Sequence, residues 1–198
     1  LRERIENGED FTALARAQGE FVGIFDADHW PDAPSFKRAW RWLSSGYDVV
    51  QGHCLARNGD ETWVSRLVAV EFEAIYAASH PGRTRLYQFG IFGGSNGYWK
   101  TDVLRATRMH GFMLTEDIDS SIRLTIAGRK IINDPLLVSR ELAPVGLKSL
   151  WHQRMRWAQG WYQVSLKHLF SALGSRHLTL RQKIGLFWLL GWREIYPW

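Results

Sequence analysis

Residues 21–25, Phe-Val-Gly-Ile-Phe, form an unbroken apolar run that ends abruptly in the polar turn Asp26-x-Asp28. A short and continuously apolar run is typical of a strand buried in a parallel sheet. Pro31 closes the turn that follows. The run therefore predicts a layered sheet domain in which two carboxylates come directly after a buried strand.

Helices and further strands alternate along the rest of the sequence up to residue 143. Amphipathic periodicity predicts the helices, short apolar runs predict the strands, and glycine or proline marks most of the ends. The expected elements are a helix over 35–44 that ends before Gly46, a strand over 47–51, a long helix over 61–78 stopped by Pro81-Gly82, a loop or bulged strand end over 89–97, a short helix capped by Thr101, a helix from the cap Thr115 to Ala127 with Gly128 after it, and one or two strands within 130–139. This alternation predicts an α/β fold.

The character of the sequence changes after Pro144. Apolar residues recur at helical spacing over 145–170, and the charged residues between Lys148 and Lys183 are all basic. A basic amphipathic helix edged with Trp and Tyr is typical of an element on a membrane surface, although a helix packed on the domain with a solvated basic face has the same pattern. The apolar tail over 184–192 is too short to span a bilayer. It predicts the start of a spanning helix, an interfacial helix or a buried terminal helix.

The composition narrows the classes of protein to which this chain can belong. Its 198 residues, 45% of them hydrophobic and 23% charged, fit one ordinary globular domain. The 11 Trp residues indicate aromatic binding platforms or a membrane-interface belt. The single cysteine, Cys54, excludes a disulfide scaffold, a cysteine-based zinc site and a redox CxxC pair. A net charge of +5 is compatible with an anionic substrate or lipid and does not require nucleic acid.

Two acidic motifs have both a structural and a chemical interpretation. The pair Asp26-x-Asp28 can cap a polar turn, or it can hold a hard cation such as Mg²⁺ or Mn²⁺ together with a diphosphate at the carboxyl end of a strand. Thr115-Glu116-Asp117 opens a predicted helix. Acidic residues in a first turn complement the helix dipole, but a carboxylate beside a glycine-rich loop can also act as a general base.

A third motif, Gln153-x-x-Arg156-Trp157, is the least expected by chance. Its three side chains share one face of the predicted helix because they stand three and four residues apart. Together they offer an amide, a guanidinium suited to phosphate and an indole ring suited to stacking on a sugar. An interfacial helix that is simply rich in Arg and Trp is the structural alternative.

With the motifs in the order Asp-x-Asp, Thr-Glu-Asp and Gln-x-x-Arg-Trp, the sequence resembles the processive family 2 glycosyltransferases. These include bacterial cellulose synthase, hyaluronan synthase, chitin synthase and poly-N-acetylglucosamine synthase. The resemblance extends from about Phe21 to His168. It is carried by Phe25-Asp-Ala-Asp28, Phe92-Gly-Gly-Ser-Asn-Gly97, Thr115-Glu-Asp117-Ile-Asp119 and Gln153-Arg-Met-Arg-Trp157.

The resemblance implies a GT-A-type, Rossmann-like fold, an α/β core with a mixed sheet flanked by helices and followed by amphipathic interfacial helices. It divides the chain into a glycosyltransferase core over 1–143 and interfacial helices over 144–198 that lead towards a membrane segment. The family's N-terminal nucleotide-binding strand is expected upstream of Leu1, so the sequence is expected to be a catalytic-core fragment. The implied location is the cell membrane, with the active site on the cytoplasmic face.

The resemblance also implies a hexosyltransferase that takes a sugar from a nucleotide-diphosphate sugar, with a UDP-sugar as the expected donor. The sugar is added with inversion to a growing β-linked polysaccharide, and Asp117 is the expected catalytic base. The donor diphosphate and its Mg²⁺ or Mn²⁺ cofactor are assigned to Asp26, Asp28, Gln153 and Arg156, with the metal on the two aspartates. The acceptor glycan is assigned to Thr115, Glu116, Trp157, Gly94, Ser95 and Asn96.

The expected partners are a nucleotide-sugar donor, a glycan acceptor and membrane lipid. Nucleic acid is not expected, because the basic residues cluster with Trp and Leu and match no nucleic-acid-binding motif. Two alternatives stay open. The first is transfer of a single sugar to a lipid or small acceptor, and the second is a non-catalytic sugar- or lipid-binding module in which Asp26-x-Asp28 is a plain turn.

Overall fold

The computed structural model describes residues 14–195, so residues 1–13 of the expected core lie outside the described part. The strands are β1 (Phe21–Ile24), β2 (Trp30–Pro31), β3 (Val49–Ala56), β4 (Gly97–Lys100) and β5 (Ile131–Glu141). The helices are α3 (Ser35–Ser44), α4 (Trp63–Glu73), α5 (His80–Tyr87), α6 (Thr101–Thr107), α7 (Glu116–Ile126), α8 (Leu147–Gly174), α9 (Leu180–Phe187) and α10 (Arg193–Ile195). Two π-helical segments join them, η1 (Ala74–Ser79) and η2 (Trp188–Trp192).

The strands form one mixed sheet in the order β1-β4-β3-β5-β2. β3 and β5 run parallel, and the other neighbouring pairs are antiparallel. The expected mixed sheet is confirmed. The prediction of a buried parallel strand over 21–25 is wrong for the part of the chain that the structure describes, residues 14–195. There, β1 is half-buried and pairs antiparallel with β4 at the edge of the sheet. A continuous apolar run indicates burial but carries no information about the direction of the neighbouring strand.

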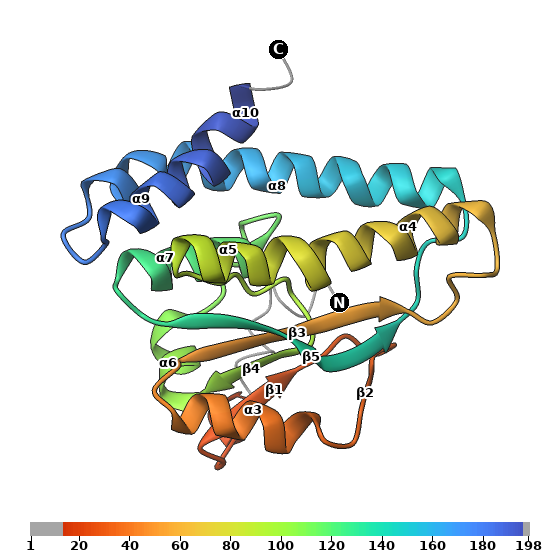
Figure 1. The fold of residues 1–198 in the computed structure, drawn as a ribbon, viewed down its shortest axis with the longest axis horizontal. Helices are drawn as coiled ribbons and strands as arrows, with labels where there is room; N and C mark the ends of the chain where they lie inside the picture. Colours follow the sequence, from red (N-terminus) through yellow and green to blue (C-terminus); the bar gives the residue numbers. More distant parts are fainter. Residues whose placement is uncertain (1–13, 196–198) are drawn as a thin grey trace.

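Helices cover both faces of the sheet (Figure 1). α3 lies on one face, and α4, η1 and α5 form a nearly continuous helix on the other face, together with α7. α8 runs across the outer side of this helical layer, with α9 beside it. The pairings make β1, β3 and β5 point the same way, so their carboxyl ends meet at one edge of the sheet, where ligands bind in open α/β folds.

One hydrophobic cluster joins the C-terminal helices to the rest of the molecule. Its buried members come from the segment before β4, from α7 and the residues just before it, and from the stretch that runs from α8 to η2. They are Phe89, Ile91, Met113, Ile118, Ile122, Val164, Ala172, Leu178, Leu186 and Leu190. Because these residues come from both sides of residue 143, the C-terminal helices share a core with α7 and with the segment before β4.

The long helix does not end at Pro81-Gly82, contrary to the expectation from the sequence. The chain remains helical through α4, η1 and α5 to Tyr87, and Pro81 stands in the first turn of α5. Proline normally interrupts a helix because it lacks the N–H for the hydrogen-bond ladder, but here the turn just before it is π-helical, with a different hydrogen-bond spacing. The π-helical turn just before it joins the two α-helices into one continuous rod.

Two of the expected helix caps act differently in the structure. Thr101 is the first residue of α6, and its hydroxyl donates to the carbonyl of Gly19 at 2.6 Å. Thr115 does occupy the N-cap position of α7, but its side chain makes no capping hydrogen bond. It packs instead against Gly160 of α8, where an added Cβ would lie 2.6 Å from the Thr115 hydroxyl oxygen. Gly128 follows α7 with a φ of +77°, as expected for a helix end.

The sheet is more extensive than the sequence predicts. β3 continues five residues beyond the expected end at Gln51, and β4 is a short strand that the glycine-rich pattern conceals. β5 runs through the whole of 131–141 as one strand, with a register shift opposite Gln51 and His53 of β3. A bulge lets a long strand keep its pairing while its twist changes, which the sequence alone does not reveal.

The apolar tail folds into α9, η2 and α10. Leu186 and Leu190 are buried, whereas Phe187, Trp188 and Trp192 are 41%, 45% and 43% exposed. Among residues 14–195, no helix combines the length and the hydrophobicity needed to cross a membrane.

Candidate active site

A cavity of about 190 Å³ opens at the sheet edge where β1, β3 and β5 end. Its wall combines the turn after β1, the glycine-rich loop before β4, the start of α7 and one face of α8. The lining residues are Asp26, Cys54, Phe72, Tyr76, Gly93, Gly94, Ser95, Thr115, Glu116, Asp117, Glu141, Gln153, Arg156 and Trp157. All three sequence motifs therefore contribute to a single cavity.

Two of the predicted site residues do not line this cavity. Asp28 is half-buried in the turn after β1, where its Oδ2 accepts a hydrogen bond from the N–H of Leu142 at 3.0 Å. The Asn96 side chain is fully buried and donates to the carbonyls of His53 and Leu137, each at 3.0 Å. Asn96 thus bridges β3 and β5 through its side chain, and only its backbone belongs to the loop.

A buried glutamine holds the glycine-rich loop in place. Gln51 of β3 accepts a hydrogen bond from the N–H of Gly93 at 2.7 Å and donates to the carbonyl of Ser95 at 2.9 Å. The hydroxyl of Ser95 in turn accepts the N–H of Asp26 at 2.9 Å. The buried side chain of Gln51 therefore fixes the position of the loop, and the loop in turn positions Asp26.

Gly94 brings the backbone of the loop close to α7. Its φ of +92° lies in the region that side chains rarely adopt, and a Cβ at this position would come 3.0 Å from Oδ2 of Asp117. Glycine is required here for both reasons. The close approach places the loop directly against the carboxylate expected to act as the base.

Asp117 is the second residue of α7, and its carboxyl group has an unusual electrostatic environment. Burial, with a smaller contribution from the neighbouring charge of Glu116, raises the pKa of Asp117 to about 7. Backbone N–H groups at the helix start and the guanidinium of Arg156 oppose this rise. A carboxylate with a pKa near neutrality is suited to accept a proton during a reaction and to release it afterwards.

Asp119 stands two residues further along α7 and faces away from the cavity. Its buried carboxylate accepts hydrogen bonds from Arg123 at 2.8 Å, Lys167 at 3.0 Å and His168 at 2.7 Å, and His110 lies 3.0 Å away. Burial alone would raise the pKa of Asp119, but these donors hold it well below its usual range. The cluster ties α7 to α8, which carries the third motif.

The acidic groups at the mouth of the cavity suit a divalent cation. Asp26 is exposed towards the opening, and its pKa is raised chiefly by partial burial and also by the negative charges of Glu141 and Asp28, while His29 and Arg156 lower it. This gathering of carboxylate oxygens is the donor set that Mg²⁺ and Mn²⁺ prefer. These carboxylates suit the divalent cofactor that the sequence predicts, and of the two aspartates assigned to it Asp26 lines the cavity while Asp28 lies outside the lining.

The face of α8 contributes two groups with hydrogen-bonding capacity to spare. The Oε1 atom of Gln153 is buried and has no hydrogen-bond partner within residues 14–195. Arg156 is exposed, and its charge acts on both Asp26 and Asp117. A buried polar atom without a partner costs free energy, so the geometry favours a ligand that reaches Gln153.

Trp157 is held in position by its neighbour Arg154. The guanidinium carbon of Arg154 lies 4.2 Å from the centre of the indole ring, and the same guanidinium pairs with Glu71 of α4. Phe72 of α4 belongs to the cluster against which Trp157 packs. One face of the indole is therefore covered by a cation, and Trp157 also lines the cavity.

Four lining residues were not anticipated from the sequence, namely Cys54, Phe72, Tyr76 and Glu141. Glu141 and Cys54 were missed because β3 and β5 extend beyond their expected ends. Tyr76 lies in η1, and such π-helical turns occur often at functional sites but have no sequence signature. The signal in the sequence that could have identified Glu141 is its position three residues after the apolar run over 136–138.

Comparison with known proteins identifies related sequences. A family model described as "Glycosyl transferase family group 2" matches residues 21–198. Poly-beta-1,6-N-acetyl-D-glucosamine synthase from Staphylococcus aureus (strain COL) is 37% identical over 98 residues, covering 47% of this chain and 21% of the relative. Glucomannan 4-beta-mannosyltransferase 9 from Arabidopsis thaliana is 25% identical over 168 residues, covering 83% of this chain and 32% of the relative. The chain thus spans a third or less of the length of these relatives.

The fold also matches a solved structure. Mannosyltransferase PcManGT from Pyrobaculum calidifontis, in complex with GDP-Man and Mn²⁺, superposes with a TM-score of 0.64 at 24% sequence identity. The match covers 89% of this chain and 46% of that chain. This likeness confirms the GT-A-type fold that the sequence predicts.

Proposed function

Because the chain belongs to glycosyl transferase family group 2, we propose that it transfers a sugar from a nucleotide-diphosphate sugar to the end of a growing β-linked polysaccharide. A UDP-sugar is the proposed donor. The observation that carries the proposal is Asp117, a carboxyl group with a pKa near 7 at the wall of a cavity that also contains Arg156. The family, the fold and the relatives named for glycan synthesis support the same reaction class.

In the proposed reaction, Asp117 takes the proton from the acceptor hydroxyl as its oxygen attacks the anomeric carbon of the donor sugar. The bond from that carbon to the diphosphate breaks, and the nucleoside diphosphate leaves with the electron pair. Attack from the face opposite the leaving group inverts the anomeric configuration. The raised pKa of Asp117 supports this role, because a base works best when its pKa lies near the working pH.

The donor is proposed to lie at the mouth of the cavity. Asp26 and Asp28 would hold a Mg²⁺ or Mn²⁺ ion, which would offset the negative charge of the diphosphate. Gln153 offers its unpartnered amide, and Arg156 pairs with the phosphate oxygens. The complex of PcManGT with GDP-Man and Mn²⁺ supports a nucleotide sugar and a divalent cation in a fold of this type.

The acceptor is proposed to approach along the glycine-rich loop. Gly94 and Ser95 let the glycan come close to the backbone, with Asn96 fixing the loop from below through its buried amide. Thr115 and Glu116 shape the pocket beside Asp117, and Trp157 stacks on the terminal sugar. The contact between Arg154 and Trp157 supports this role because it presents the indole in one orientation.

The C-terminal helices are proposed to rest on the cell membrane, with the active site on the cytoplasmic face. Large apolar side chains remain exposed on α8, α9 and η2, and large exposed apolar patches mark protein or membrane contacts. The exposed residues are Leu147, Trp151, Tyr162, Leu166, Phe170, Leu180, Ile184, Trp188 and Trp192. An interfacial position would deliver the glycan end to the membrane and explain why the basic residues lie among these apolar groups.

The proposal is tested by measuring nucleotide release and sugar transfer by the full-length protein in membranes. UDP-glucose, UDP-N-acetylglucosamine and GDP-mannose are compared with Mg²⁺, with Mn²⁺ and with EDTA. Metal-dependent release with one donor is expected, and product length separates chain elongation from single-sugar transfer to a lipid or small acceptor. Absence of turnover with every donor in folded protein would overturn the proposal in favour of a non-catalytic sugar- or lipid-binding module.

A further inference from the structure

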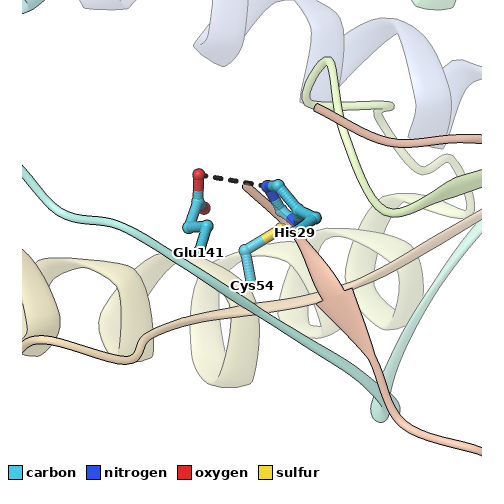
Figure 2. A group of neighbouring side chains, drawn as sticks. All are labelled: His29, Cys54 and Glu141. Carbon is cyan, nitrogen blue, oxygen red and sulfur yellow. Dashed lines mark ion pairs between the residues drawn. The ribbon is translucent and has the colours of Figure 1, made fainter. Parts of the chain in front are cut away.

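Three metal-binding side chains point towards one another beside the cavity (Figure 2). Cys54 and Glu141 come from the neighbouring strands β3 and β5, and His29 directly precedes β2. Cys54 of β3 pairs in register with Ser139 of β5, and Glu141 stands two residues further along the same face. β2 begins at Trp30 and pairs antiparallel with the end of β5, which brings His29 opposite Glu141. Strand register, set by the whole sheet, is what assembles the group.

The spacing of the three side chains suits a metal ion. One ligand atom from each of His29, Cys54 and Glu141 lies within 4.8 Å of the other two. In a tetrahedral zinc site the bonds of about 2.0–2.3 Å place neighbouring ligand atoms roughly 3.5 Å apart. The ligand atoms therefore stand at most about 1.3 Å further apart than in such a site.

The histidine ring is arranged as metal-bound histidines are. Its Nδ1 lies 3.0 Å from the hydroxyl of Ser139, a partner of the kind that fixes ring orientation in metal sites. Nε2 lies 3.1 Å from Oε2 of Glu141 but has no hydrogen-bond partner within residues 14–195. The His29 side chain is fully buried, so a cation placed between Nε2 and the carboxylate would satisfy both atoms.

The electrostatic surroundings also favour a cation. Cys54 is 1% exposed, and burial, reinforced by the charge of Glu141, raises the pKa of its thiol well above the usual value. The carboxylate of Asp26 adds further negative charge nearby. Such a thiol becomes a thiolate when a metal ion replaces its proton.

We propose that His29, Cys54 and Glu141 form a binding site for a thiophilic divalent cation, with Zn²⁺ as the best match. The site supplies one nitrogen, one sulfur and one oxygen ligand, and each of these is a ligand type that zinc takes in proteins. Cys54 and Glu141 also line the cavity, so an ion held by them would lie within reach of a molecule bound there. The site differs from the all-oxygen pair Asp26 and Asp28, which suits Mg²⁺ or Mn²⁺.

A single cysteine argues against a zinc site built from cysteines, but it leaves a mixed site possible and makes the test unambiguous. Cys54 is the only cysteine in the sequence, so any sulfur-to-metal signal reports on it alone. Co²⁺ is added to the purified protein, and the sulfur-to-cobalt charge-transfer absorption in the near ultraviolet is recorded. We expect the absorption to saturate at one equivalent and to vanish when Zn²⁺, but not Mg²⁺, is added.

Variants separate the ligands from their surroundings. Cys54→Ser is expected to abolish the absorption, and His29→Ala and Glu141→Gln to weaken Co²⁺ binding at least 10-fold. Ser139→Ala should weaken it by about 10- to 100-fold through the histidine ring. His152→Ala, on the exposed surface of α8, is the matched control and should leave the absorption unchanged.

Two results would overturn the proposal. The first is the absence of the cobalt absorption from the wild-type protein together with no Zn²⁺ retained in native mass spectrometry, a result that needs no variant. The second is an absorption of unchanged affinity in folded His29→Ala and Glu141→Gln proteins, with folding checked by circular dichroism. Neither result depends on sugar transfer, so the proposed function is tested separately.

Discussion

Asp117 and Asp119 stand two residues apart on α7, yet their surroundings are opposite. Asp117 faces the cavity, where burial and Glu116 raise its pKa to about 7. Asp119 faces α8, where Arg123, Lys167 and His168 donate to it and hold its pKa well below the usual range. The first carboxylate is kept ready to bind a proton, and the second is kept charged.

Within one turn of α7, one carboxylate faces the proposed site of reaction and the other stabilises the packing of the helix. An Asp-x-Asp spacing turns the two side chains about 200° apart around the helix axis, so they face different neighbours. The packed side anchors α7 to α8, and this anchoring holds the cavity side in position. A change at one carboxylate should therefore affect activity and a change at the other should affect folding.

The largest expected effect is that of Asp117→Asn on catalysis. An amide cannot accept the proton, so kcat should fall about 10³-fold while the affinity for the donor stays within a factor of a few. Steady-state kinetics and calorimetric titration of the nucleotide measure the two quantities. The free energy of unfolding at pH 8 should rise by roughly 1 kcal/mol, because a carboxylate that is costly to ionise in the fold has been removed. Transfer at the wild-type rate would contradict the role of Asp117.

Asp119→Asn should show the reverse pattern. Removing the carboxylate leaves four basic groups, Arg123, Lys167, His168 and His110, without their shared partner, and the free energy of unfolding should fall by about 2–4 kcal/mol. Urea unfolding measures this loss. In the protein that remains folded, kcat should fall far less than in Asp117→Asn. Wild-type stability, or a larger loss of kcat than that of Asp117→Asn, would break the proposed division between the two carboxylates.

Acidification should separate the two carboxylates within one protein. Asp117 must be deprotonated to act, so activity should fall about 10-fold per pH unit below its pKa near 7. The raised pKa means that the native state binds this proton more tightly than the unfolded chain. The contribution of Asp117 to stability therefore decreases as pH rises from 3.8 to about 7.

Asp119 has the opposite linkage, because its pKa is lowered in the fold. Its contribution is fully present above the unfolded value of 3.8 and is lost as pH falls towards its folded pKa. Activity profiles between pH 4 and 8, and urea unfolding between pH 2 and 8 in wild type, Asp117→Asn and Asp119→Asn, check both signs. If stability in Asp117→Asn depended on pH as it does in the wild type, the raised pKa of Asp117 would be contradicted.

The smallest expected effect is that of Gly94→Ala, which disturbs Asp117 without reaching Asp119. The φ of +92° and the 3.0 Å approach to Oδ2 of Asp117 both oppose a methyl group. Stability should fall by about 1 kcal/mol and kcat about 10-fold. Gly82→Ala in α5 is the matched control, since a Cβ there meets nothing within 4 Å and should be neutral or slightly stabilising. Equal effects of the two substitutions would argue against a special role for the loop.

The local pattern of the sequence predicted many of the elements that build the site. Helical periodicity placed Gln153, Arg156 and Trp157 on one face, and in the structure all three line the same cavity. The apolar run before Asp26 predicted a strand that ends at the site. These predictions succeeded because they depend on spacing within a single element.

Features that depend on contacts between distant elements were not predictable. The continuation of the helix past Pro81 required the π-helical turn of η1, and the full lengths of β3 and β5 required their pairing with one another. The burial of the Asn96 side chain between these strands moved it away from the acceptor wall to which the sequence assigned it.

By itself, the sequence determined the alternation of strands and helices, the three motifs and the family, because each is a matter of residue type and spacing along one chain. The tertiary structure alone decided that the pKa of Asp117 is raised to about 7 while that of Asp119 is lowered, and that His29, Cys54 and Glu141 meet beside the cavity. The physical reason is that pKa values and metal sites depend on burial and on charges a few ångströms away, and these neighbours are brought together only when the sheet and α8 have packed.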